Sequence, residues 1–167
     1  MEKYSYLCSE REKNMINSTF IGDCLAKMDD KGRVVFPSSL KAQVPDGCGM
    51  RFVLHKDIFR KCLEMYTFEE WQAEAESTKS KLDLTFNPDH AEFWSKYMED
   101  SAIVVPDPKL GRILIPRHLQ ESAGLTREVM FAGKGYKIEI WDKEVYAASR
   151  MSNDRYRALA KGLSQQR

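Results

Sequence analysis

A stretch from Asp29 to Pro37 occurs twice in the chain, and this repeat limits the possible folds more than any other feature. The second copy occupies residues 110–116 and reads Leu-Gly-Arg-Ile-Leu-Ile-Pro. Aligning Gly32 with Gly111 gives an offset of 79 residues (111 − 32), and the same register matches the arginine and the proline that follow. Such self-similarity indicates two copies of one supersecondary unit, not one continuous sheet or bundle.

A second match extends the repeat toward the end of each copy. Residues 63–66 (Leu-Glu-Met-Tyr) correspond to residues 138–141 (Ile-Glu-Ile-Trp) at an offset of 75 (138 − 63). The change of offset from 79 to 75 places four extra residues in a loop of the first copy. Each copy spans only about 45 to 50 residues, a size at which a lone unit buries little surface. We therefore expect the two copies to share one core.

Periodicity and capping signals predict an α+β fold. Strands are expected at residues 20–28, 33–36, 50–54, 62–66, 103–105, 112–115, 129–132 and 137–141. Helices are expected at residues 38–44, from 67 toward the lysines at 79 and 81, at 87–98, from 116 to the glycine at 124, and from 142 through 146. Residues 133–135 (Gly-Lys-Gly) are expected to form the turn of a hairpin.

The charges are unevenly distributed although the net charge is only +1. Residues 67–101 carry three basic and nine acidic side chains, whereas residues 149–167 carry five basic and one acidic. The middle of the chain is thus an acidic spacer, and the end is a basic tail that either forms a helix, with Tyr156, Leu159 and Leu163 on one face, or is disordered. Because a near-neutral chain releases few counterions from a polyanion, DNA binding would require several copies acting together.

Neither metal binding nor catalysis is indicated by the reactive side chains. The cysteines are widely spaced and form no Cys-x-x-Cys pair; they are Cys8, Cys24, Cys48 and Cys62. We interpret them as reduced thiols of an intracellular protein, with no zinc site. The histidines His55, His90 and His118 fall in different elements, and no nucleophile elbow or phosphate-binding loop accompanies them. No apolar run reaches the roughly 18 residues of a membrane span. We expect a soluble protein that is not an enzyme and needs no cofactor.

The repeated turn is the best candidate for a functional site. Gly32 can adopt the positive φ that a tight turn requires, and Asp29 can accept hydrogen bonds from the turn backbone. An ordinary turn does not require an arginine directly after the glycine in both copies, at Arg33 and Arg112. A guanidinium held by a nearby aspartate suits phosphate oxygens or guanine edges. From spacing alone, DNA binding and an ordinary tight turn remain equal alternatives.

Several motifs in order resemble the MraZ family of bacterial transcriptional regulators. They are Phe20-Ile21-Gly22, the run from Met28 to Pro37, and residues 111–116, 123–129 and 138–142. The resemblance covers about residues 20–147. It implies two SpoVT/AbrB-like domains that form an intramolecular pseudo-dimer, assembly into ring-shaped homo-oligomers, and a cytoplasmic, nucleoid-associated protein. It also implies control of the division and cell-wall gene cluster, which usually includes the regulator's own gene.

The family signature Asp-x-x-x-Arg, which is tied to DNA binding, maps onto Asp29 and Arg33. In the second half Pro108 stands four residues before Arg112, and Asp107 stands five residues before it. The orienting aspartate is therefore expected to be displaced or lost, so that the first turn binds DNA and the second mainly completes the fold. The candidate DNA-binding residues are Asp29, Lys31, Arg33, Lys27, Arg112 and Lys109.

These inferences define five segments and leave one functional alternative open. The segments are an N-terminal extension (1–19), the first domain (20–70), a helical acidic spacer (71–100), the second domain (101–147) and the basic tail (148–167). Translation is proposed to start at Met15, which would make residues 1–14 an over-called extension. The alternative function is an antitoxin-like interaction or scaffold protein that does not bind an operator directly.

Overall fold

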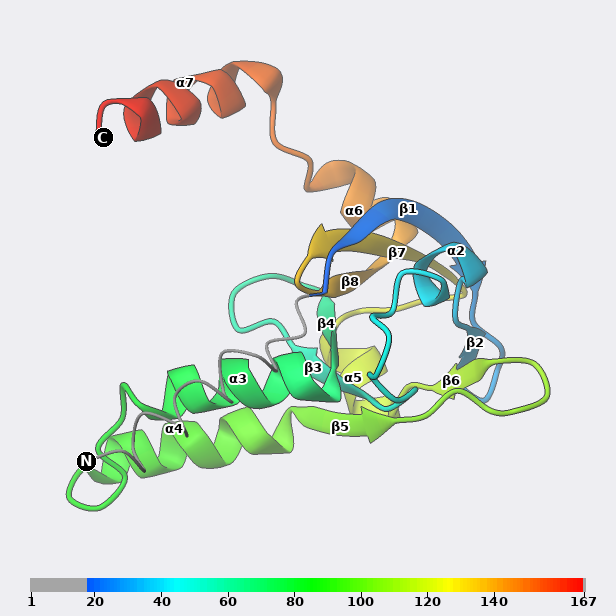
Figure 1. The fold of residues 1–167 in the computed structure, drawn as a ribbon, viewed down its shortest axis with the longest axis horizontal. Coiled ribbons are helices and arrows are strands. Elements are labelled where there is room, and N and C mark those ends of the chain that lie inside the picture. The colour runs from blue at the N-terminus through cyan, green and yellow to red at the C-terminus, as the bar shows by residue number, and fades with distance from the viewer. Residues whose placement is uncertain (1–17, 167) are drawn as a thin grey trace, which may run out of the picture.

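The computed structural model describes residues 18–166, so the Met15 start and nearly all of the N-terminal extension lie outside the described residues (Figure 1). The strands are β1 (Phe20–Lys27), β2 (Arg33–Val35), β3 (Phe52–Lys56), β4 (Leu63–Thr67), β5 (Ser101–Val104), β6 (Arg112–Leu114), β7 (Glu128–Gly135) and β8 (Ile138–Asp142). The helices are α2 (Ser38–Lys41), α3 (Phe68–Lys79), α4 (Pro88–Glu99), α5 (Arg117–Ser122), α6 (Lys143–Ala148) and α7 (Asn153–Ser164). The predicted α+β class is confirmed.

The strands form two antiparallel sheets whose order is symmetric. One sheet has the order β1-β7-β8-β4-β3-β5, and the other is the pair β2-β6. In the alignment of the two copies, β1 corresponds to β5, β2 to β6, β3 to β7 and β4 to β8. If each strand is replaced by its equivalent from the other copy, the six-stranded order becomes the same order read backwards. Each copy gives its first strand to the hairpin of the other copy, since β1 pairs with β7 and β5 pairs with β3. Neither copy completes a sheet alone.

The core lies between one face of the large sheet and the β2–β6 pair. Alternate residues of β4 and β8 point into it, and Val34 and Ile113 close it from the small sheet. The leucines that the repeat matches, Leu40 in α2 and Leu119 in α5, are both 0% exposed. Burying one such side chain contributes about 1.5–3 kcal/mol. The pattern shared by the two copies is therefore largely a core pattern.

Helix starts agree with the capping signals. Pro37 and Pro116 precede α2 and α5, as predicted, although α2 ends at Lys41 and not at Val44. Asn87 caps α4 through its side chain. Thr67 accepts a hydrogen bond from the Glu70 backbone N–H at 3.3 Å and caps α3. α3 and α4 lie side by side and project from the strands (Figure 1).

The interpretation of residues 133–135 as a hairpin turn was right for Gly135, which has a φ of 78° in the turn between β7 and β8, and wrong for Gly133. These residues belong to β7 and pair with β1, with Gly133 opposite Gly22. The turn runs from Lys134 to Lys137: the Lys134 backbone N–H donates to the Lys137 carbonyl at 2.9 Å, with Gly135 and Tyr136 between them. A Cβ atom at Gly133 would lie 2.7 Å from the backbone nitrogen of Ile21. Glycine is needed there because β1 approaches β7 closely, not because the chain reverses.

The basic tail forms a helix, α7, whose first turn is capped by Ser152. α7 extends away from the strands, and all its side chains are exposed (Figure 1). Of the alternatives left open by the sequence, the helix is the one observed. Within residues 18–166, no helix combines the length and the apolar character needed to cross a membrane.

Candidate nucleic-acid interface

The β2–β6 pair forms a short ribbon with one buried face and one outward face. Val34 and Ile113 face the core, and the residues on either side of them face outward. The outward residues are Arg33, Val35, Arg112 and Leu114. Arg33 lies opposite Leu114, and Arg112 lies opposite Val35. The two arginines are therefore diagonal neighbours on the two strands, with roughly 7–8 Å between their Cα atoms. The ribbon presents two arginines and two apolar side chains on one surface.

The first turn holds Arg33 through the carboxylate of Asp29. Asp29 Oδ1 accepts hydrogen bonds from the backbone N–H groups of Lys31 (3.0 Å) and Arg33 (2.9 Å). Asp29 Oδ2 accepts from Arg33 Nε at 2.8 Å. Gly32 has a φ of 81°, which completes the turn. One carboxylate therefore shapes the turn and orients the arginine.

The second turn does the same with Asp107, so the expectation of a displaced or lost aspartate was wrong. Asp107 Oδ2 accepts from Arg112 Nε at 2.9 Å and from the Arg112 backbone N–H at 3.0 Å. Its Oδ1 accepts from the backbone N–H groups of Lys109 (3.1 Å) and Leu110 (2.8 Å). The turn contains one more residue than the first. The extra residue is absorbed within the turn, and the carboxylate reaches the same atom of the arginine.

Each arginine keeps its outer donors available. The aspartates engage only Nε of Arg33 and Arg112, and within residues 18–166 no acceptor contacts the terminal nitrogens Nη1 and Nη2. The two arginine side chains are about one-third exposed, at 36% and 29%. A guanidinium fixed by Nε, with both terminal groups free, matches the two-donor recognition of phosphate or of a guanine edge.

The aspartates remain charged at neutral pH. Backbone hydrogen bonding from Arg33, together with the guanidinium, lowers the pKa of Asp29 below its usual value. Hydrogen bonds from the Leu110 backbone and the Arg112 side chain lower the pKa of Asp107. The charged form of each carboxylate is the one that accepts these bonds, so both clamps persist at neutral pH.

The other sequence-predicted candidates surround the two turns. Lys31 and Lys109 are exposed, one in each turn, and the turns lie at opposite ends of the ribbon because β2 and β6 are antiparallel. Lys27 is exposed at the end of β1, two residues before the first turn. Sequence reasoning overlooked the apolar pair on the outward face, Val35 and Leu114. Their alternation with Val34 and Ile113 was a usable signal.

Gln120 supports the first turn in a way that has no counterpart in the second. Its Nε2 donates to the Ile115 carbonyl at 2.7 Å. The same amide fills the space next to Gly32, where an added Cβ atom would lie 2.0 Å from Nε2. At Gly111, in contrast, an added Cβ atom would meet nothing within 4 Å. In both turns an aspartate binds the arginine, but within the described residues only the first turn has a side chain packed against its glycine.

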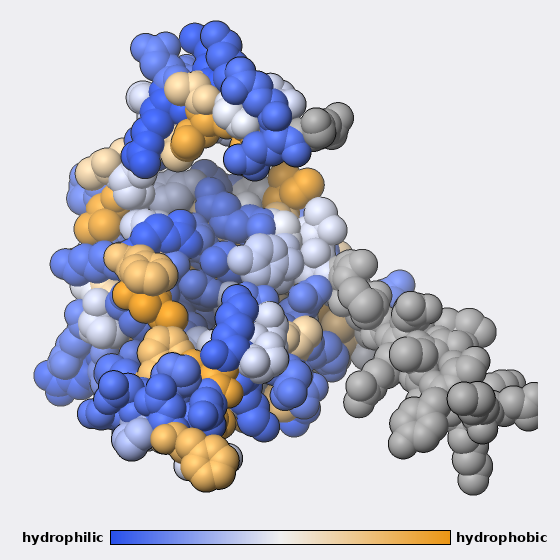
Figure 2. Space-filling model, turned by 90° about the vertical axis from the view of Figure 1, so that its left-hand side faces the viewer, coloured by the Kyte–Doolittle hydropathy of each residue, from blue (hydrophilic) through white to orange (hydrophobic). Residues whose placement is uncertain are grey.

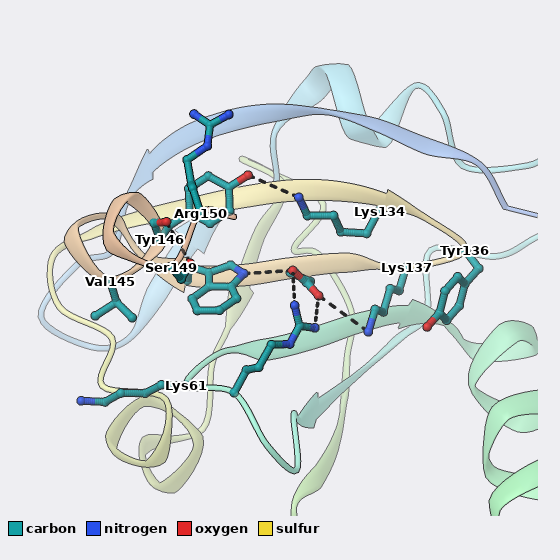
Figure 3. A pocket seen from close by; sticks show the side chains of 11 residues that line it. Lys61, Lys134, Tyr136, Lys137, Val145, Tyr146, Ser149 and Arg150 are labelled. Carbon is teal, nitrogen blue, oxygen red and sulfur yellow. Dashed lines mark hydrogen bonds and ion pairs between the residues drawn. The ribbon is translucent and has the colours of Figure 1, made fainter. Parts of the chain in front are cut away.

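The opposite face of the large sheet carries a buried charge network (Figure 3). Glu64 of β4 lies directly across from Glu139 of β8, and Lys137 Nζ lies 3.4 Å from the first and 3.7 Å from the second. Arg60 pairs with Glu139 and also with Asp57, at 2.9 Å. Burial raises the pKa of Glu64. A cavity of about 750 Å³ opens beside this network, and its lining is mainly basic and aromatic.

Three side chains in this region are of the types that bind metal ions. A carboxylate oxygen of Asp57, the Cys62 sulfur and a carboxylate oxygen of Glu139 lie within 4.8 Å of one another. Arg60 already donates to both carboxylates, and burial raises the pKa of the Cys62 thiol to about 12. A metal needs the thiolate and would compete with the guanidinium. The arrangement is better explained as an ion-pair network that neutralises the centre of the sheet.

Comparisons with known proteins give one consistent result. The sequence model of a family described as "MraZ protein, putative antitoxin-like" matches residues 105–154. The chain is 35% identical over 125 residues to a Transcriptional regulator MraZ of Bacteroides fragilis, covering 75% of this chain and 78% of the relative. It is 34% identical over 127 residues to the protein of that name from Caldanaerobacter subterraneus, covering 76% and 83%. The names of these relatives describe a non-enzymatic role.

Proposed function

The chain belongs to the MraZ family, whose relatives are named transcriptional regulators, and from this premise we propose that it is a sequence-specific DNA-binding regulator of transcription. It binds short repeated sequences upstream of the division and cell-wall gene cluster that includes its own gene. It does so as a ring-shaped homo-oligomer in the cytoplasm, associated with the nucleoid. The site of contact is the outward face of the β2–β6 ribbon.

One observation carries this proposal. Arg33 and Arg112 lie on one face of a two-stranded ribbon, each is clamped at Nε by an aspartate, and each has unpaired terminal donors within the described residues. The major groove of DNA admits a two-stranded ribbon, and a guanidinium can donate two hydrogen bonds to guanine. The exposed Val35 and Leu114 between the arginines suit contact with thymine methyl groups.

The two copies form two SpoVT/AbrB-like domains, at residues 20–70 and 101–147, which associate as an intramolecular pseudo-dimer. The exchange of β1 and β5 between the copies and the symmetric strand order support this organisation. The spacer at 71–100 joins the domains, and the tail at 148–167 follows them. An approximate two-fold relation between the turns suits DNA half-sites of similar sequence.

Assembly into a ring compensates for the weak DNA affinity expected of a single, nearly neutral chain. One chain has a net charge of +1, so its own gain from counterion release is small. Linking binding sites raises the overall affinity by roughly 10²–10⁴ without any new contact, provided that the sites can engage DNA together. A ring that presents many ribbons to repeated DNA sequences meets this condition.

The test is DNA binding by the full chain carrying Arg33→Ala, with Lys81→Ala as the control. Both changes remove one positive charge, but Lys81 follows α3 near the α3–α4 connection, away from the ribbon (Figure 1). Binding to DNA from upstream of the chain's own gene is measured by gel shift over a salt series. A lost bidentate arginine contact costs about 1–3 kcal/mol, so Arg33→Ala weakens binding by about 5- to 150-fold per contact.

The same series distinguishes the proposal from its alternative. Equal affinity of the Arg33→Ala and Lys81→Ala variants refutes the ribbon as the contact surface. The absence of any salt-dependent affinity favours an antitoxin-like interaction protein, the reading that the description of the family favours. The slope of log affinity against log salt is about −0.9 for each phosphate engaged.

A further inference from the structure

α7 is a helix with no packing partner in the described chain. It spans 12 residues from Asn153 to Ser164, and none of its side chains is buried. Isolated helices shorter than about 12–15 residues are marginal in water, and most helices in proteins are stabilised by packing an apolar face. A helix of this length that leaves the body of the protein is suited to pack against another surface.

The helix has the apolar stripe that such packing uses. Tyr156, Leu159 and Leu163 recur at the spacing of one helical face and are 67%, 50% and 68% exposed. The other positions of α7 carry mainly basic charge, with Arg155 and Lys161 among them. The matching surface must therefore be apolar at its centre and acidic at its rim.

The groove between α3 and α4 has these properties. Trp71 and Ala75 of α3 face Trp94 and Met98 of α4 across a hollow of about 250 Å³. The residues from 67 to 101 that build both helices carry nine acidic and three basic side chains. Figure 2 views the molecule from the side toward which α3, α4 and α7 project, and it shows hydrophobic side chains among hydrophilic ones on the helix at the top and on the body below it.

The cavity beside the charge network matches α7 less well than this groove. The larger cavity, beside the charge network, is lined by five cationic side chains and a single acidic one (Figure 3). These cations are Arg60, Lys61, Lys134, Lys137 and Arg150. A basic helix would be repelled there. Of these two surfaces, the α3–α4 groove is the one whose charge complements α7.

α7 does not fill the groove of its own chain, which leaves both surfaces open to a second copy. In Figure 1 α7 and the α3–α4 pair project to the same side, α7 above and the pair below, and in the part of the chain that the structure describes no α7 side chain is buried or lines the groove. A contact between such different surfaces of identical chains is heterologous, and it produces a closed ring when the rotation between copies closes. We propose that α7 of each chain packs its apolar stripe into the α3–α4 groove of the next chain and so builds the homo-oligomer. This contact rests on the ring assembly of the proposed function.

The first test compares Leu159→Asp with Ala158→Asp in the full chain. Both changes add one negative charge, but position 158 points about 100° away from position 159 around the helix. Native mass spectrometry measures the assembly. Leu159→Asp gives a species near the single-chain mass of 19.3 kDa, whereas Ala158→Asp keeps the mass of the unaltered assembly. Circular dichroism verifies that both variants are folded. An unaltered assembly in Leu159→Asp overturns the proposal.

The second test locates the acceptor surface. Met98→Lys places a positive charge in the groove, at an exposed position of α4, and dissociates the assembly. If Leu159→Asp dissociates the chain and Met98→Lys does not, the acceptor is another surface and the proposed contact is wrong. Measuring mass without DNA separates this result from the proposed DNA contact, because the Arg33→Ala variant keeps the full assembly mass if the ribbon only binds DNA.

Discussion

Replacing the glycine of each turn by alanine probes the different surroundings of Gly32 and Gly111. Gly32 and Gly111 occupy equivalent positions and both have positive φ, at 81° and 66°. An alanine in the left-handed region costs about 1–2 kcal/mol. For Gly111→Ala this backbone cost is the main effect, since the new Cβ atom meets no atom within 4 Å.

Gly32→Ala carries an additional cost. The new Cβ atom would lie 2.0 Å from Gln120 Nε2 and 3.1 Å from the Ile115 carbonyl oxygen. The Gln120 amide must move and lose its 2.7 Å hydrogen bond to Ile115, which contributes about 0.5–1.5 kcal/mol. We therefore expect Gly32→Ala to destabilise the protein by about 2–3 kcal/mol, and Gly111→Ala by about 1–2 kcal/mol.

Urea unfolding at one fixed protein concentration measures the difference, because assembly makes stability depend on concentration. The double variant Gly32→Ala/Gln120→Ala is the control. With the amide removed from both the reference and the variant, the cost of the glycine change should approach that of Gly111→Ala. A larger destabilisation by Gly111→Ala than by Gly32→Ala would refute this account of the turns.

Two further predictions follow from the same geometry. Arg112→Ala weakens DNA binding by a factor similar to that of Arg33→Ala, because both arginines are clamped at Nε; an Arg112→Ala variant with unaltered affinity in the gel-shift series contradicts this. His55 is buried, which lowers its pKa to about 4. The unfolded chain binds that proton near pH 6.5, so the free energy of unfolding decreases by up to about 3 kcal/mol as pH falls from about 6.5 to about 4. Urea unfolding at several pH values measures this decrease, and the His55→Gln variant should show a smaller one. An equal decrease in both proteins would exclude His55 as its cause.

Much of the local structure could be predicted because its causes are local. Pro37 and Pro116 precede helices, Thr67 and Asn87 cap helices, and Gly32 takes a positive φ. Each of these outcomes depends on the residue itself and on neighbours within a few positions.

The candidate site was predicted only in part. The first turn has the expected aspartate and arginine, but the role of Asp107 could not be found by counting residues. A carboxylate is placed by the path of the backbone, and a turn one residue longer brought Asp107 Oδ2 to 2.9 Å from Arg112 Nε. The spacing of a motif along the chain is therefore a poor measure of the distance between its side chains.

By itself, the sequence determined the two copies, their helices and strands, and the arginine that follows each glycine, because these depend on short-range geometry and on hydrophobic pattern. Tertiary structure alone decided that β1 pairs with β7 of the other copy, that Gly133 and Gly22 meet within a sheet, and that Arg33 and Arg112 share one ribbon face. These pairings join residues that are distant along the chain, and what selects them is the burial of one common core.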